Sequence, residues 1–217
     1  GSRGLGDVYK RQNHENKIFY VTDEKEQSQY INMFKESDQD ALILPHNIDN
    51  PFIGRLEQKH ENLKFFRIDA DVNETMKEEV AEEDKESFKK TEETLTEVFR
   101  KALGDDKLQV KVEKLKNESI SSMITVSEEP RRMQEMMKMY NMYGMDPSMF
   151  GGSGQVLILN ANNNLVQYVL EHGEGENTAK ICEQLYDLAL LSHGSLTPER
   201  MTNFIARTNE IMGMLAK

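Results

Sequence analysis

Three short apolar runs alternate with amphipathic stretches near the start of the chain. The runs at 17–22 (KIFYVT), 41–45 (ALILP) and 64–69 (KFFRID) are rich in β-branched and aromatic residues, which favour strands. Strands that alternate with helical stretches are typical of βαβ units and a parallel sheet. The pattern therefore predicts a small α/β subdomain at residues 13–72, with a three-stranded parallel sheet in βαβαβ order.

The two stretches between these runs repeat their apolar residues every three or four positions, as a helix with one buried face does. In the first stretch, Thr22 and Asp23 are candidates for the helix cap. In the second stretch, Pro51 suits the first turn of a helix. The residues predicted to face the core are Tyr30, Met33 and Phe34 in the first helix, and Phe52, Ile53 and Leu56 in the second.

After the third run the pattern changes. The acidic segment 73–86 has few apolar residues and indicates a linker that runs into a helix. That helix ends at Gly104, since glycine is common just after the last helical residue. Segments 107–115 and 119–127 are predicted to form a hairpin-like strand pair. The apolar stripe of the helix consists of Phe88, Leu95, Val98, Phe99, Ala102 and Leu103.

A glycine-rich break at 151–154 precedes a strongly apolar strand, QVLILN, at 155–160. Three helices are predicted after this strand, so residues 87–217 should form an α+β domain. The first of these helices spans 162–173, and its inward residues are predicted to be Leu165, Val166, Val169 and Leu170.

The last two helices, at 177–193 and 197–216, form a helical hairpin. Gly194 can close the first helix, while Thr197 caps the second and Pro198 takes its first position. Their apolar residues recur in steps of three and four, which suits packing against partner helices. These residues can pack within one chain, or two hairpins can form a dimeric four-helix bundle. The candidate dimer interface is Ile181, Leu185, Leu188, Leu191, Met201, Phe204, Ile205, Thr208, Ile211, Met212 and Leu215.

The segment 131–150 is rich in methionine. Part of it forms one stripe of a helix, which core packing explains, but Met142, Met145 and Met149 lie outside that stripe. Copper(I) can use methionine pairs, although no histidine or cysteine reinforces them here. Flexible, polarisable methionines also suit a surface that adapts to many partners. The residues of this candidate binding surface are Met133, Met136, Met137, Met139, Tyr140, Met142, Tyr143, Met145 and Met149.

Composition narrows the classes of function. The chain has 217 residues, 30% of them charged, and a net charge of -11, which disfavours binding to nucleic acid or to anionic membranes. Cys182 is the single cysteine, so no internal disulfide can form and a reducing cytoplasm is expected. No apolar run is long enough for a membrane span. Residues 1–12 lack apolar periodicity and are interpreted as a non-native or disordered leader.

The usual signatures of a catalytic, cofactor or metal site are missing from the sequence. The glycines at 151–154 lack the Gly-Lys-Ser/Thr continuation of a phosphate loop, and a strand follows them instead of a helix. The five histidines are scattered along the chain. His172 and His193 stand at the predicted C-terminal ends of helices, where a protonated imidazole interacts favourably with the helix dipole. The carboxylates at 78–86 lack calcium-loop spacing. We therefore expect no catalytic, cofactor-binding or metal-binding residues.

Successive segments of the chain, in order, resemble the ninety-kilodalton heat-shock chaperones. KIFYVT, ALILPHNIDNPFIGRLEQ and KFFRIDAD resemble the end of that family's middle domain. VKVEKLKNESISSMITVSEEPRRMQEMMK resembles the start of its C-terminal domain, and LILNANNNLVQYV, LYDLALLSHG and PERMTNFIARTNEIMGML resemble later parts. The resemblance covers residues 17–217. The bacterial HtpG type fits best, because the chain stops at Lys217 without the Met-Glu-Glu-Val-Asp tail that recruits tetratricopeptide co-chaperones.

The resemblance implies a homodimer made by the closing helices, and a methionine-rich helix at 131–143 that contacts client proteins. It also implies that the ATP site, with its magnesium and the arginine that assists hydrolysis, lies upstream of this chain. The fragment itself would then be no enzyme and would bind no ATP.

We therefore expect a fragment of a cytoplasmic, stress-response chaperone that dimerises and offers an adaptable apolar surface to unfolded or partly folded proteins. One alternative is a structural dimerisation module without client binding. Another is a nucleotide-binding enzyme fragment that uses the βαβαβ unit, against which the glycine pattern argues.

Overall fold

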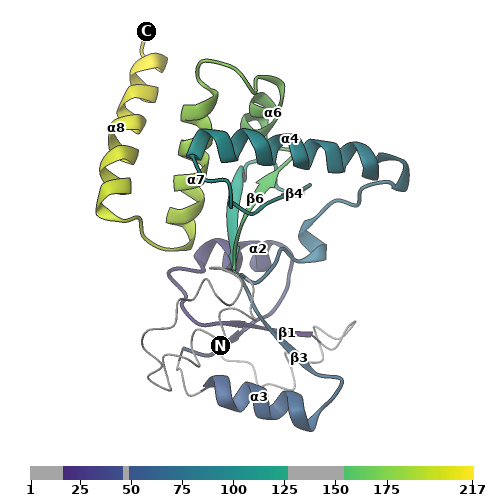
Figure 1. Ribbon diagram of the computed structural model, residues 1–217. Helices are drawn as coiled ribbons and strands as arrows, with labels where there is room; N and C mark the ends of the chain where they lie inside the picture. The colour runs from purple at the N-terminus through teal and green to yellow at the C-terminus, as the bar shows by residue number, and fades with distance from the viewer. Residues whose placement is uncertain (1–16, 46–48, 127–153) are drawn as a thin grey trace. The chain divides into compact units, whose positions relative to one another are not determined.

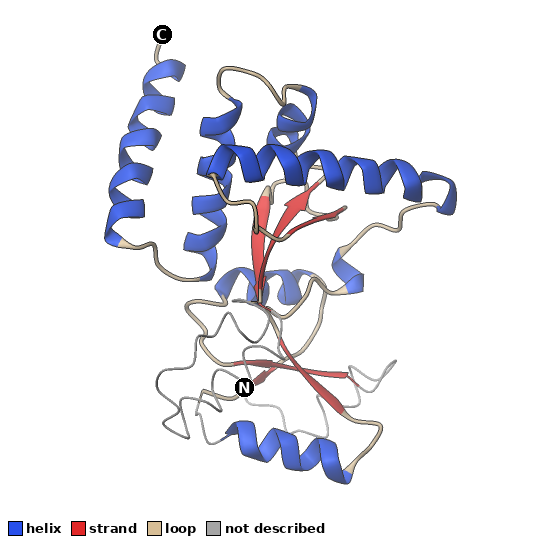
Figure 2. Cartoon of the chain, in the orientation of Figure 1, coloured by secondary structure: helices blue, strands red, loops and turns tan. Residues whose placement is uncertain are grey.

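The computed structural model describes residues 17–45, 49–126 and 154–217 (Figure 1). Contacts between residues divide the chain into two units. The first unit runs to Val72, and the second contains Asn73–Thr125 and Gln155–Lys217. Each unit has its own sheet and its own helices (Figure 2).

The sheet of the first unit has the strand order β2-β1-β3. Its strands are β1 (Lys17–Val21), β2 (Leu42–Ile43) and β3 (Lys64–Arg67), and both outer strands pair with β1 in parallel. Helix α2 (Ser28–Glu36) connects β1 to β2, and α3 (Asp49–Lys59) connects β2 to β3. The predicted βαβαβ unit with a three-stranded parallel sheet is confirmed.

Apolar side chains from the strands and both helices form the core of this unit. Ile18, Tyr20, Ile53 and Phe65 make one buried cluster. The three residues of α2 that the helical spacing predicted to be inward are buried as well. Phe52 was predicted to face the core but is largely exposed, because it lies about 100° around α3 from Ile53.

The predicted cap of α2 is wrong. The helix begins at Ser28, and Thr22 and Asp23 lie in the turn before it. The buried side chain of Gln27 accepts hydrogen bonds from the backbone N–H groups of Thr22 and Asp23, at 2.9 and 3.1 Å. The Asp23 carboxylate accepts two more from the following backbone. Short polar side chains accept hydrogen bonds from nearby backbone N–H groups both in turns and at helix caps. The sequence alone therefore does not distinguish a turn residue from a helix cap.

The sheet of the second unit has the order β4-β6-β5, so the predicted hairpin of β4 and β5 is wrong. Strand β4 (Val110–Glu113) pairs in parallel with β6 (Gln155–Asn160), which lies between β4 and β5 (Ser122–Val126). The central place suits β6 because a strand buried on both faces needs a continuous apolar run. Its fully buried apolar residues are Leu157, Ile158 and Leu159.

Helix α4 (Lys85–Leu103) packs against β4 and against two of the helices that follow β6 (Figure 1). Two short 3-10 helices, Glu74–Met76 and Glu82–Asp84, occupy the segment predicted as a linker. In the described ranges, no helix combines the length and the apolar character needed to cross a membrane. The helices after β6 are α6 (Asn164–Glu171), α7 (Thr178–His193) and α8 (Pro198–Leu215).

Most helix ends follow the predicted signals. Gly104 ends α4 with a φ of 63°, a left-handed conformation that glycine adopts without strain. Gly194 follows α7, and Pro198 is the first residue of α8. The Thr197 side chain caps α8 by accepting a hydrogen bond from the backbone N–H two residues after Pro198. In α6, Val166 and Val169 point inward as predicted, but Leu165 is largely exposed.

Asn160, at the end of β6, is buried and uses its whole side-chain amide. Its Oδ1 accepts hydrogen bonds from the backbone N–H groups of Leu115 and Asn162, at 3.0 and 3.1 Å. Its Nδ2 donates to the carbonyl groups of Asn117 and Ile120, at 3.1 and 2.7 Å. One side chain therefore ties the connection between β4 and β5 to the end of the central strand.

Two edge strands have a backbone N–H group covered by a glutamate. The Glu57 carboxylate of α3 accepts a hydrogen bond from the N–H of Phe65 in β3, at 3.0 Å. The Glu92 carboxylate of α4 accepts one from the N–H of Val112 in β4, at 2.9 Å. Covered edges of this kind oppose pairing with a strand from another molecule.

Asn160→Ala should lower the free energy of unfolding by about 2–4 kcal/mol, because it leaves buried backbone groups without partners. Asn164→Ala is a matched control, since Asn164 is exposed at the start of α6 and should change stability by less than about 0.5 kcal/mol. Denaturant unfolding measures both values. Equal stability of the two variants would contradict the role assigned to Asn160.

Candidate functional site

Helix α7 buries two different faces. One face is an apolar stripe directed into the core of the second unit, where the Ser122 hydroxyl donates to the backbone carbonyl of Leu185 at 2.8 Å. The other face carries Asp187, which is only 1% exposed and lies roughly opposite the stripe at 100° per residue. A buried carboxylate needs charged or hydrogen-bonding partners. The stripe consists of Thr178, Cys182, Leu185 and Ala189.

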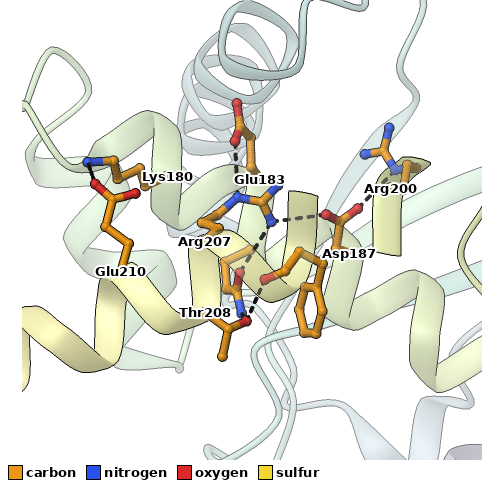
Figure 3. Close-up of polar contacts among 9 residues, drawn as sticks. Lys180, Glu183, Asp187, Arg200, Arg207, Thr208 and Glu210 are labelled. Carbon is orange, nitrogen blue, oxygen red and sulfur yellow. Dashed lines mark hydrogen bonds and ion pairs between the residues drawn. The ribbon is translucent and has the colours of Figure 1, made fainter. Parts of the chain in front are cut away.

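Two arginines of α8 provide the partners of Asp187 (Figure 3). The Arg200 Nε donates to Oδ1 at 2.9 Å, and the Arg207 Nη1 donates to Oδ2 at 3.0 Å. Arg200 also lies over the ring of Tyr186, with 4.9 Å between the guanidinium carbon and the ring centre. Both carboxylate oxygens are therefore paired with a cation, as a buried charge requires.

The rest of the contact between α7 and α8 contains further polar pairs. Arg207 also donates to Glu183 at 3.1 Å and to Gln184 at 3.2 Å. Gln184 in turn donates to the hydroxyl of Thr208 at 3.0 Å. At the far end, Lys180 and Glu210 form an exposed ion pair at 2.6 Å, and the hydrogen bond that Lys180 donates to the Glu210 carboxylate raises the pKa of Lys180. Ion pairs and hydrogen bonds therefore fix α8 against α7.

Two exposed apolar residues of α8, Ile205 and Met212, lie on a different face from the arginines. Arg200 and Arg207 are seven residues, or two turns, apart and face α7. Ile205 and Met212 are also seven residues apart, but they lie roughly 120–160° around the helix from these arginines. Both are more than half exposed, at 53% and 54%, and Leu215 is 84% exposed. Phe204 and Ile211 lie within about 60° of the arginines and are half-buried, so α8 has apolar residues on both sides and leaves the side with Ile205 and Met212 uncovered.

The residues predicted to form a dimer interface fall into three groups. Leu185 is buried within its own chain, so it is not available to a second one. The largely exposed group contains Leu188, Ile205, Met212 and Leu215. The half-buried group contains Ile181, Leu191, Met201, Phe204, Thr208 and Ile211. The half-buried group is partly covered within its own chain, whereas the exposed group is not, and contact of either group with a second copy stays a prediction.

A groove with a volume of about 400 Å³ follows the polar contact between α7 and α8 and reaches Leu103 of α4. Its charged residues are already paired with one another. Lys180 pairs with Glu210, and Asp187 pairs with both arginines. The groove therefore has no excess charge with which to attract an ion.

Cys182 lies in the apolar stripe of α7 and is fully buried. Burial raises the pKa of its thiol to about 12, and the negative charge of Glu183 adds to the shift. A neutral, enclosed thiol is a poor nucleophile. Within the described parts of the chain, no cluster of three or more His, Cys, Asp or Glu is placed to hold a metal ion.

The predicted client-binding surface at 131–150 lies outside the described residues. The methionines and tyrosines assigned to it therefore stay predictions from the sequence.

Sequence reasoning missed the pairing of Asp187 with Arg200 and Arg207. Two signals were present. The arginines are two turns apart on one helix, and Asp187 interrupts an otherwise apolar stretch, LYDLALL. A charge within an apolar run predicts a buried partner of opposite sign.

The family model described as "Hsp90 protein" matches residues 5–216, nearly the whole chain. The chain belongs to the HSP90 family. The region of this family that it represents contains the polar helix contact and the exposed face of α8.

Curated relatives of this HSP90 chain are bacterial proteins named Chaperone protein HtpG. The protein from Bacteroides thetaiotaomicron is 33% identical over 163 residues, which cover 71% of this chain and 23% of the relative. The protein from Bacteroides fragilis strain 638R is 32% identical, covering 75% of this chain and 24% of the relative. The Treponema denticola protein is 27% identical over 90% of this chain and 30% of the relative. The chain thus spans about a quarter of the length of these relatives.

We expect Cys182 to be unreactive in the folded HSP90 chain. At pH 8, a thiol whose pKa is about 12 is deprotonated in roughly one molecule in 10,000. A disulfide reagent such as DTNB should therefore label the native protein much more slowly than the protein unfolded in guanidinium. Rapid labelling of the native protein would contradict the burial of Cys182.

Proposed function

We propose that this HSP90 chain is a dimerisation module in which the apolar face of α8 packs against the same face of a second copy. The observation that supports this is the exposure of Ile205 and Met212 on a side of α8 that points away from the ion pairs with α7, together with the exposure of Leu215 at the end of the helix. A helix of a polar chain gains nothing from an uncovered apolar face in water. A cover of matching chemistry is therefore expected.

A second copy suits this surface because a two-fold interface is self-complementary. Each residue of the exposed apolar face of α8 is then buried in both copies. A fully buried aliphatic side chain contributes roughly 1.5–3 kcal/mol, so a short stripe gains considerably from this doubling. Leu188 of α7 is exposed as well, and we include it in the proposed interface.

We also propose that the methionine-rich segment at 131–150 contacts client proteins. The support is its composition, since methionine side chains adapt to surfaces of different shape. Membership of the HSP90 family and the names of the curated relatives, which call them chaperones, agree with this role.

The activity of the whole protein is part of the same proposal. This chain would hold two copies of a cytoplasmic chaperone together, while ATP and magnesium bind in parts of the protein outside residues 1–217. A structural dimerisation module without client contact is the second candidate. The exposed face of α8 supports both candidates equally, so a client assay has to separate them.

Replacing Ile205 and Met212 with aspartate should convert a dimer into a monomer at micromolar concentration. The charges would lie in the centre of the apolar contact, where burying an unpaired carboxylate is costly. Asn203→Asp is the matched control, because it adds the same charge at an exposed position of the same helix that lies roughly opposite Ile205 and Met212. Sedimentation velocity measures the change.

Wild-type chain that sediments as a monomer at micromolar concentration would overturn the dimerisation proposal. Dimers of the double aspartate variant would show that another surface holds the copies together.

Replacing Met136, Met139 and Met142 with serine should weaken the suppression of aggregation of a model client. The substitution removes apolar, flexible contact surface. Sedimentation of the same variant serves as the control and should show no change in association. Equal suppression by the variant and the wild type would refute client contact and favour the structural module.

A further inference from the structure

We propose that Asp187 is a positioning residue that sets the rotation of α8 about its own axis. It would thereby decide which face of α8 is free to meet a second copy. This inference rests on the proposed dimerisation, and it adds a residue that does not itself take part in the predicted interface.

The geometry around Asp187 fixes α8 in two respects. Each carboxylate oxygen is used by a different arginine, at 2.9 Å from Arg200 and 3.0 Å from Arg207. Because both arginines lie on one face of α8, rotation of the helix would withdraw both from the carboxylate. Because they lie two turns apart, a shift along the axis that shortens one contact lengthens the other.

Charged hydrogen bonds specify orientation more strictly than apolar packing does, because their energy depends on distance and angle. The neighbouring bonds share this property. Arg207, whose side chain is nearly buried, also donates to Glu183 and Gln184. The α7 face therefore matches one rotational setting of α8.

Asp187 also excludes the competing arrangement. Without a buried charge on α7, α8 could also pack in a rotated setting, with Ile205 and Met212 towards α7 in place of the arginines. In that setting the apolar face of α8 would cover the Asp187 carboxylate and leave it without a cation. Burying an unpaired carboxylate is strongly unfavourable, so the charge keeps the apolar residues outward.

Other polar contacts between the helices are less suited to this role. Lys180 and Glu210 are exposed, and an exposed ion pair contributes little to stability. Lys180→Gln therefore provides a matched control that removes an ion pair between the same two helices without uncovering a buried charge.

The test uses the rate at which a thiol placed on the apolar face reacts. Cys182 is the single natural cysteine and is buried, so Met212→Cys introduces one accessible thiol. The labelling rate with DTNB is measured on diluted, monomeric protein, first with Asp187 and then with Asp187→Leu. We expect Asp187→Leu to slow labelling of position 212 by roughly tenfold or more, because the apolar face then turns towards α7.

Sedimentation of Asp187→Leu, without the added thiol, gives the second readout. We expect its dimer to be weaker by roughly tenfold or more, while Lys180→Gln matches the wild type. Cys182 should stay unreactive in Asp187→Leu, which separates a rotated α8 from general unfolding.

Unchanged labelling of position 212 in folded Asp187→Leu would overturn the positioning role, whatever happens to dimerisation. A wild-type chain that never dimerises would overturn the proposed function, but the labelling rates would still test the rotation of α8. If Cys182 becomes reactive in Asp187→Leu, the isosteric Asp187→Asn replaces it. In that variant, an unaltered labelling rate and dimer affinity would overturn the proposal.

Discussion

The organisation of the C-terminal helices depends on one buried carboxylate. Asp187 lies on the face of α7 opposite the apolar stripe, and two arginines of α8 pair with it. Without the two arginines, the Asp187 carboxylate would be a buried charge without a cation, which is strongly unfavourable. The arginines of α8 therefore have to face α7. Buried ion pairs add little net stability compared with apolar packing, and they act mainly by excluding other arrangements. The consequence is an apolar face of α8 that points into solvent.

In this arrangement, one set of residues attaches the pair of helices α7 and α8 to its own chain, and a different set is exposed and available to a second chain. The apolar stripe of α7, which includes Cys182 and Leu185, attaches the pair to its own sheet and to α4. Polar contacts then attach α8 to α7. The apolar side chains that remain, among them Ile205 and Met212, are free for association between copies. A subunit can in this way fold with its hairpin already in the setting that a partner requires.

Local patterns in the sequence predicted much of the fold. Alternating strands and helices indicated the parallel sheet of the first unit, and Gly104 and Thr197 marked helix ends correctly. Pairings between distant segments were harder, because β6 enters between β4 and β5 from far along the chain. The helical period showed which residues of α8 share a face, but it could not show what each face meets. That depends on Asp187, whose partners lie on another helix.

The central claim is that the apolar face of α8 meets its copy in a second chain. Ala206→Cys places a nitroxide spin label on α8 beside that face, at an exposed position about 100–120° around the helix from Ile205 and Met212, and buried Cys182 should stay unlabelled. Pulsed electron resonance then measures the distance between labels. The account predicts one narrow distance between two chains, whose signal falls when unlabelled protein is mixed in. Absence of any dipolar signal at micromolar concentration would contradict it.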